Sequence, residues 1–146
     1  MVSENVIGLA ELESAWNATR KGDTETKLAI YKLFSNLSIH FKEEQIEFII
    51  EKISEIEPSE MIPDEIELVY ELSRFSSKSS TYTNKAKEFF WKIICDPENL
   101  YPTEIREPAL YKFCYIMRSW DLIEERVTVL YDCVENIKNV THYNYL

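Results

Sequence analysis

The sequence predicts an all-α fold of about seven helices in one compact domain, and three observations lead to this prediction. Apolar side chains recur at intervals of three and four residues along nearly the whole chain, which is the spacing of one helix face. The 146 residues include only two glycines, too few for the many tight turns of a β-sandwich or barrel. Hydrophobic residues make up 45% of the chain, enough apolar surface to exclude general disorder.

The first three predicted helices span about residues 5–20, 24–39 and 43–56, and each carries its apolar residues on one face. Those residues are Val6, Leu9, Leu12 and Trp16 in the first helix, Leu28, Tyr31, Phe34 and either Leu33 or Leu37 in the second, and Ile46, Ile49, Ile50, Ile53 and Ile56 in the third. Between the first two helices, Gly22 is expected to adopt the left-handed conformation of a helix C-cap. Asp23 is expected to cap the next helix by accepting a backbone hydrogen bond.

Four further helices complete the prediction, and they span about residues 63–75, 84–95, 104–118 and 122–139. Their inward residues include Ile66, Val69, Tyr70 and Leu72, then Phe89, Phe90, Trp91 and Ile94, and finally Val127, Leu130, Val134 and Ile137. We therefore expect a single helical-repeat domain over residues 1–140, followed by a tail at residues 141–146 that lacks helical periodicity.

Polar residues and prolines separate the last four helices. Residues 76–81 are rich in Ser and Thr, which predicts a loop and the most mobile segment of the chain. Asp96 and the proline after it are expected to stop the fifth helix. Thr103 is expected to cap the sixth helix, and Pro108 falls near its first turn, where a missing N–H group costs little.

Three of the predicted helices share a pattern of two apolar residues, two variable residues, one apolar residue and one small residue. The pattern occupies residues 33–38, 68–73 and 90–95. A small residue after the last apolar position allows a neighbouring helix to approach closely. The pattern therefore favours armadillo- or HEAT-like stacking, in which each helix pair buries its apolar face against the next pair. Because the offsets of 35 and 22 residues are unequal, an irregular helical bundle is the alternative.

Negative charge is concentrated in one part of the chain. Residues 43–71 contain eleven acidic residues and one basic residue, so this segment alone accounts for the formal net charge of −10. The candidate partner-binding face consists of Glu43, Glu47, Glu51, Glu55, Glu65, Glu67 and Glu71. Such a face would attract a basic surface on a protein partner and speed the encounter. The alternative is a solvated outer face that only keeps the protein soluble.

The residue types needed for catalysis, metals or cofactors are scarce. No glycine-rich phosphate or dinucleotide motif occurs, and the two histidines, His40 and His142, have no ligand at metal spacing. Cys95, Cys114 and Cys133 lie in apolar helical patterns without a CxxC motif, which predicts buried, reduced thiols. We therefore predict no catalytic residue, no metal and no cofactor.

The composition also excludes two classes of partner. An acidic chain without basic runs is a poor nucleic-acid binder. No apolar run approaches the roughly 20 residues needed to cross a bilayer. The N-terminus lacks the basic flank and apolar core of a signal peptide. Together with the reduced thiols, these features predict a cytoplasmic or nuclear protein.

Several short segments occur in an order and spacing that is typical of one family. They are Trp16, Lys21-Gly22, residues 33–38, residues 41–46, residues 89–94, Ala109-Leu110 and residues 133–138. In this order they resemble the non-catalytic helical region of the fat facets-type ubiquitin-specific proteases. In that family, armadillo-like stretches flank a papain-like catalytic domain. The glycine-rich cysteine box and the histidine box of that domain have no counterpart here, so no catalytic residue is carried over.

The resemblance implies a fragment of a large deubiquitinase that helps to recruit protein partners or ubiquitinated substrates and does not itself hydrolyse ubiquitin conjugates. The first alternative is a helical-repeat adaptor that is unrelated to ubiquitin. The second alternative is a small helical enzyme.

Overall fold

The computed structural model describes residues 7–74 and 80–118, together with Tyr131 and Glu135. These residues form six α-helices and no strand. The helices are α1 (Leu9–Lys21), α2 (Thr24–Leu37), α3 (Glu43–Ser54), α4 (Pro63–Arg74), α5 (Ser80–Cys95) and α6 (Thr103–Arg118), with a short 3-10 helix, η2 (Ser38–His40), after α2. They correspond in order to the first six predicted helices. The predicted helix at 122–139 and the tail lie outside the described residues, except that Tyr131 and Glu135 are both helical.

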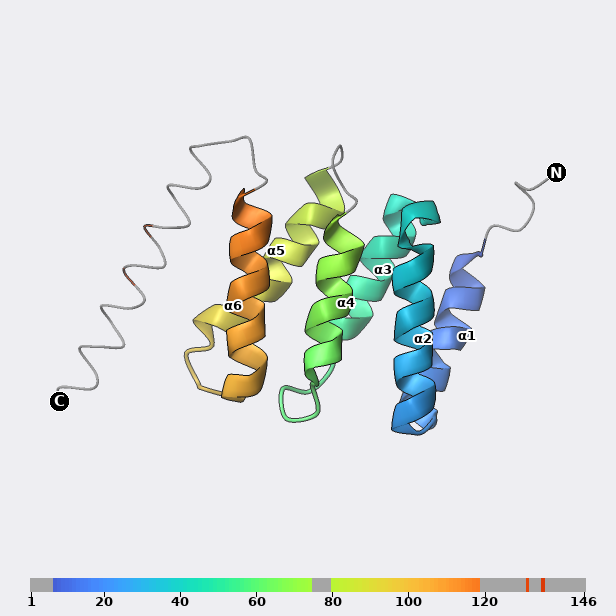
Figure 1. Ribbon diagram of the computed structural model, residues 1–146, viewed down its shortest axis with the longest axis horizontal. Coiled ribbons are helices and arrows are strands. Elements are labelled where there is room, and N and C mark those ends of the chain that lie inside the picture. Colours follow the sequence, from blue (N-terminus) through green and yellow to red (C-terminus); the bar gives the residue numbers. More distant parts are fainter. Residues whose placement is uncertain (1–6, 75–79, 119–130, 132–134, 136–146) are drawn as a thin grey trace.

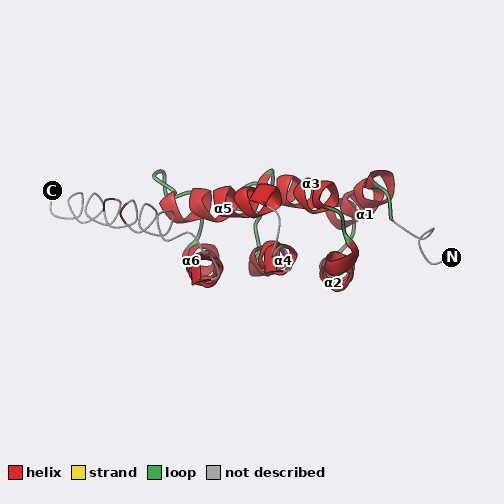
Figure 2. Cartoon of the chain, turned by 90° about the horizontal axis from the view of Figure 1, so that it is seen from above, coloured by secondary structure: helices red, strands yellow, loops and turns green. Residues whose placement is uncertain are grey.

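The six helices form pairs that are stacked side by side in two layers (Figures 1 and 2). Seen from above, α1, α3 and α5 lie in one layer, and α2, α4 and α6 lie in the other (Figure 2). Contacts run along each layer, from α1 to α3 to α5 and from α2 to α4 to α6, and also between the two helices of each pair. Each pair therefore covers the apolar face of its neighbour. This arrangement confirms the predicted stack of helix pairs and excludes the irregular bundle.

One continuous apolar core runs between the layers through all the pairs. Its members include Leu12, Trp16, Tyr31, Phe34, Ile49, Ile53, Ile66, Val69, Leu72, Phe90, Ile93, Ile105 and Phe113. Two residues that were predicted to point inward, Leu9 and Leu28, are instead 43% and 37% exposed. Leu9 is the first residue of α1, and Leu28 is turned by about 120° from Phe34 around the axis of α2. Of the two alternatives in α2, Leu37 is half-buried and Leu33 is exposed.

The apolar run of α5 enters the core one residue away from the predicted register. Phe89, Phe90 and Ile93 are buried, whereas Trp91 and Ile94 are only half-buried. Residues 89–94 are apolar at every position except one, so two registers have nearly equal apolar content and periodicity cannot choose between them. The six-residue pattern shared by residues 33–38, 68–73 and 90–95 does not mark structurally equivalent positions either. Its first two copies lie on α2 and α4 in one layer, whereas the third lies on α5 in the other layer.

The turn between α1 and α2 forms in part as predicted. Asp23 caps α2, since its side chain accepts a hydrogen bond from the backbone N–H of Thr26 at 2.8 Å. This bond lowers the pKa of Asp23. The prediction that Gly22 is left-handed is wrong, because its φ of −83° and ψ of 175° are those of an extended residue. Glycine is needed for a different reason: a Cβ atom there would lie 2.9 Å from the carbonyl oxygen of Ala18.

Helices α5 and α6 begin earlier than predicted, whereas α5 ends at the predicted residue. Helix α5 begins at Ser80, so the last part of the predicted loop at 76–81 is helical, and residues 76–79 lie outside the described residues. Thr103 is the first residue of α6 and not its cap, which places Pro108 in the second turn. The stop at Asp96 is confirmed: its carboxylate accepts hydrogen bonds from the backbone N–H groups of Leu100 at 2.9 Å and Tyr101 at 2.8 Å.

The register of α5 is tested by truncating two adjacent aromatic residues. Phe90→Ala is expected to lower the free energy of unfolding by about 3–5 kcal/mol, because the Phe90 ring is fully buried. Trp91→Ala is expected to cost clearly less, because this ring packs at the edge of the core, 5.7 Å from the Phe113 ring centroid. Urea unfolding of both variants measures the difference. Ile93→Val and Ile94→Val form a milder matched pair with the same expected order, and the reverse order would support the register predicted from the sequence.

Candidate functional site

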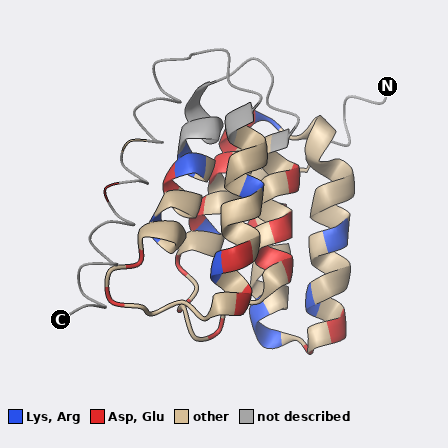
Figure 3. Ribbon diagram, turned by 60° about the vertical axis from the view of Figure 1, so that its left-hand side comes forward, with Lys and Arg blue, Asp and Glu red and all other residues tan. Residues whose placement is uncertain are grey.

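The residues of the predicted acidic face are divided between two helices. Glu43, Glu47 and Glu51 lie on α3 and Glu55 directly follows it as its C-cap, whereas Glu65, Glu67 and Glu71 lie on α4. These helices belong to different layers of the stack (Figure 2). In Figure 3 the acidic positions are accordingly spread over several helices. The structure therefore does not bring all seven residues together on one helix face.

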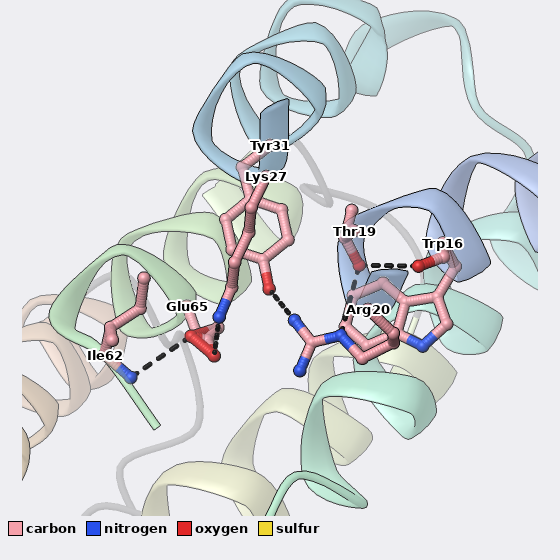
Figure 4. Close-up of polar contacts among 7 residues, drawn as sticks. All are labelled: Trp16, Thr19, Arg20, Lys27, Tyr31, Ile62 and Glu65. Atoms are coloured by element: carbon pink, nitrogen blue, oxygen red, sulfur yellow. Dashed lines mark hydrogen bonds and ion pairs between the residues drawn. The ribbon is translucent and has the colours of Figure 1, made fainter. Parts of the chain in front are cut away.

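Glu65 differs from the other six because it is completely buried, so its predicted place on an acidic surface is wrong. Its side chain lies between α4 and α2 (Figure 4). Oε1 is 3.4 Å from Nζ of Lys27, and Oε2 accepts a hydrogen bond from the backbone N–H of Ile62 at 3.2 Å. Glu65 precedes buried Val69 and Leu72 by four and seven positions, which places it on the apolar face of α4. That spacing is the sequence signal that could have located it.

The buried carboxylate depends on Lys27 for its charge partner. Burial raises the pKa of Glu65, although the hydrogen bond from Ile62 and the Lys27 ammonium group act in the opposite direction. Oε1 accepts no well-formed hydrogen bond within the part of the chain that the structure describes, so the ion pair is its principal interaction. The Lys27 side chain is itself only 15% exposed. A buried charge that loses its partner is strongly destabilising.

Aromatic rings and a second cation surround this ion pair (Figure 4). Nζ of Lys27 lies 5.8 Å from the ring centroid of Tyr31, and that ring stacks on Trp16 at 6.2 Å. Arg20 donates a hydrogen bond to the Tyr31 hydroxyl at 2.7 Å and lies 4.8 Å from the Trp16 ring centroid. Burial and the Glu65 carboxylate raise the pKa of Tyr31, so this phenol stays neutral. The cluster joins α1, α2 and α4.

Two lysine–glutamate pairs also bridge the junction between the second and third helix pairs, one in each layer. Lys85 of α5 donates a hydrogen bond to Glu51 of α3, and this bond raises the pKa of Lys85. Lys112 of α6 lies 2.9 Å from a carboxylate oxygen of Glu67 on α4. These side chains are more exposed than the Lys27 pair, so each bridge is worth about 0–1 kcal/mol. In all three ion pairs the central helix pair, α3 and α4, supplies the glutamate and a flanking helix pair supplies the lysine.

The outward side of α3 keeps a row of carboxylates, which we call the outer acidic row. It consists of Glu44, Glu47, Glu51 and Glu55, of which Glu47 is half-buried and the others are exposed. The row lies opposite the buried isoleucines of α3. Glu51 and Glu55 also make ion pairs, with Lys85 and with Lys52 at 3.9 Å. Glu43 is half-buried beside the row.

Within residues 7–74 and 80–118, Tyr131 and Glu135, no group of three or more His, Cys, Asp or Glu side chains is placed to hold a metal ion. His40 is exposed at the end of η2, and His142 lies outside the described residues. The helices in this described part of the chain are too short or too polar to cross a membrane.

Two cysteines are less buried than predicted. Cys95 is half-buried, whereas Cys114 is exposed and its thiol is free. Cys114 follows buried Phe113 directly, but a helix turns by about 100° per residue, so apolar neighbours in sequence do not imply a shared face. Cys133 lies outside the described residues.

Comparison with known protein families gives a match that covers nearly the whole chain. A family model described as UBP24/USP9X/USP9Y ARM repeat matches residues 1–144. No curated protein and no solved structure matches the chain. The match confirms the resemblance to the helical region of the fat facets-type ubiquitin-specific proteases, and it identifies the stacked helix pairs as ARM repeats.

The dependence of Glu65 on its cation is tested by a double substitution. Lys27→Met is expected to lower the free energy of unfolding by about 3–5 kcal/mol at neutral pH, because it leaves a buried carboxylate unpaired. Adding Glu65→Leu is expected to recover most of this loss, since apolar groups often replace a buried ion pair at little cost. Urea unfolding compares the variants. Lys112→Met, which breaks a more exposed ion pair, is the control and should lower the free energy of unfolding by less than about 1 kcal/mol. Equal losses of stability for the two lysine variants would contradict the buried ion pair between Lys27 and Glu65.

The raised pKa of Glu65 predicts a pH dependence of stability. The folded carboxyl group retains its proton at pH values where the unfolded group, with its ordinary pKa of 4.5, has lost it. This group therefore contributes stability that is present below 4.5 and is lost as the pH rises through the folded pKa. Urea unfolding at a series of pH values should show the wild type gaining stability relative to Glu65→Gln as the pH falls from neutral towards 4.5. A stability difference that is constant over this range would refute the pKa shift.

Proposed function

Because the chain belongs to the UBP24/USP9X/USP9Y ARM repeat family, we propose that it is a non-catalytic, protein-binding section of a large deubiquitinase. ARM repeats form extended surfaces for protein partners. The proposed role is to recruit partners or ubiquitinated substrates for a catalytic domain that lies elsewhere. The family match favours this role over an adaptor that is unrelated to ubiquitin.

The observation that carries the proposal is the outer acidic row on α3. Its carboxylates point away from the core, and they belong to a segment that holds the entire net charge of the chain. Exposed charges of one sign attract an oppositely charged surface over a distance of about one Debye length, ~8 Å at physiological ionic strength. The partner proposed for this row is therefore a protein with a basic surface, which the row would steer into contact.

Two chemical features of the chain support a cellular compartment and a class of partner for this interaction. Cys114 is exposed and free, a state that persists in reducing compartments. An acidic surface repels nucleic-acid phosphates, so a protein partner is favoured. We therefore place the proposed interaction in the cytoplasm or the nucleus.

Charge reversal within the outer acidic row tests the proposal. A partner is first captured with the immobilised chain, identified and purified. Glu44→Lys combined with Glu47→Lys is expected to slow its association by about tenfold or more at low salt, and the difference should shrink as salt screens the charges. Stopped-flow measurement of the on-rate at low and high salt checks this result. The two sites avoid Glu51 and Glu55, whose ion pairs would also be broken.

A variant with the same change in net charge is the matched control. Glu25→Lys combined with Glu98→Lys alters two exposed positions, one on α2 and one in the loop before α6. This control should slow association much less than the substitutions on α3. Equal effects of the two variants would show that only the total charge matters, and the outer acidic row would then be a solvated surface.

A further inference from the structure

Two tyrosines, Tyr70 and Tyr115, meet at the junction of α4 and α6, and a third, Tyr111, lies beside Tyr115 on α6; we call the three the tyrosine surface. Tyr111 and Tyr115 of α6 are 67% and 56% exposed, and Tyr70 of α4 is half-buried. The rings of Tyr70 and Tyr115 lie 6.5 Å apart between centroids. Tyr111 precedes Tyr115 by four positions, which places both on the same side of α6. Such exposed aromatic area is characteristic of binding surfaces.

Carboxylates flank these rings on both helices. On α4, Glu67 precedes Tyr70 by three positions and Glu71 follows it directly. On α6, exposed Glu107 precedes Tyr111 by four positions, so the two side chains are neighbours on the helix surface. The tyrosine surface therefore combines exposed ring faces with negative charge, and it is complementary to a cation that can stack on a ring.

The protein itself already places a cation in this chemical setting. Nζ of Lys112 lies 4.2 Å from the ring centroid of Tyr70 and 2.9 Å from a carboxylate oxygen of Glu67. Lys27 is held in the same manner by the Tyr31 ring and the Glu65 carboxylate. A tyrosine ring next to a glutamate is thus a cation site that recurs in this fold. The rings of Tyr111 and Tyr115 expose more of their surface than Tyr70 or Tyr31.

We propose that the tyrosine surface binds arginine side chains from an extended segment of a protein partner. A guanidinium group is planar, so it stacks on an exposed ring while its N–H groups donate to a neighbouring carboxylate. A lysine ammonium group attracts the same carboxylates but lacks the flat face for stacking. This surface lies on α4 and α6, in the layer opposite to the outer acidic row on α3, so it goes beyond the proposed function.

The test uses the full chain and two labelled peptides, one of alternating arginine and serine and one of alternating lysine and serine. Fluorescence anisotropy is expected to show the arginine peptide binding at least about threefold more tightly than the lysine peptide. Tyr111→Leu combined with Tyr115→Leu should weaken binding of the arginine peptide by about fourfold to twenty-five-fold, from a loss of about twofold to fivefold at each ring. Tyr111→Phe combined with Tyr115→Phe keeps the rings and should stay within about twofold of the wild type.

Two further variants make the result specific. Glu44→Lys combined with Glu47→Lys should weaken both peptides by the same factor and leave the preference for arginine unchanged, which separates this proposal from the one for the outer acidic row. If the leucine pair shifts the thermal unfolding curve, the affinity of the single variant Tyr111→Leu for the arginine peptide is the deciding measurement, since Tyr111 is the more exposed ring. Equal affinity for the two peptides, or leucine variants that bind the arginine peptide as tightly as the wild type, would overturn the proposal.

Discussion

The ion pair between Lys27 and Glu65 determines how the first helix pair meets the second. Glu65 is completely buried, and the Lys27 ammonium group is the cation that compensates it. Such a pair adds little net stability compared with apolar side chains, because both charges lose their hydration. It does restrict geometry, however. A slip of α2 along α4 by one turn, about 5.4 Å, would leave the carboxylate buried without its partner. The pair therefore selects one alignment of the two helices from several that the apolar core alone would tolerate.

The same logic explains why the strongly acidic segment is compatible with a stable stack. Residues 43–71 form the central pair, and their glutamates face lysines from both flanking pairs: Lys27 on one side, and Lys85 and Lys112 on the other. The central pair is thus attracted to each neighbour. Exposed bridges of this kind contribute little individually. Their distribution nevertheless favours the observed order of the pairs, since two acidic pairs placed side by side would repel.

The sequence was sufficient for the fold class, the order of the first six helices and the Asp23 cap, because these depend on local periodicity and local hydrogen bonds. The errors occur where tertiary packing decides. In α5 an almost continuous apolar run permits two registers, and packing against neighbouring helices selects the one that buries Phe90 and Ile93. Glu65 was assigned by its chemical type, although its spacing to Val69 and Leu72 already placed it on the buried face. Its partner on α2 is a contact between distant segments that periodicity does not reveal.

The division of the chain into two layers also determines how its surfaces can be used. Consecutive helices alternate between layers, so a continuous acidic stretch of sequence is split, and its α3 and α4 residues serve different sides of the molecule. Conversely, Tyr70 and Tyr115 are distant in sequence but lie together, because α4 and α6 are neighbours in one layer. The two surfaces also act over different distances. In the roles proposed for them, the outer acidic row would attract a partner at long range and affect mainly the rate of encounter, whereas stacking on a tyrosine ring would require contact and affect mainly the lifetime of a complex. A single partner that carries both a basic surface and an arginine-containing segment would have to reach around the stack to contact both layers. Two smaller partners could instead bind the two layers independently.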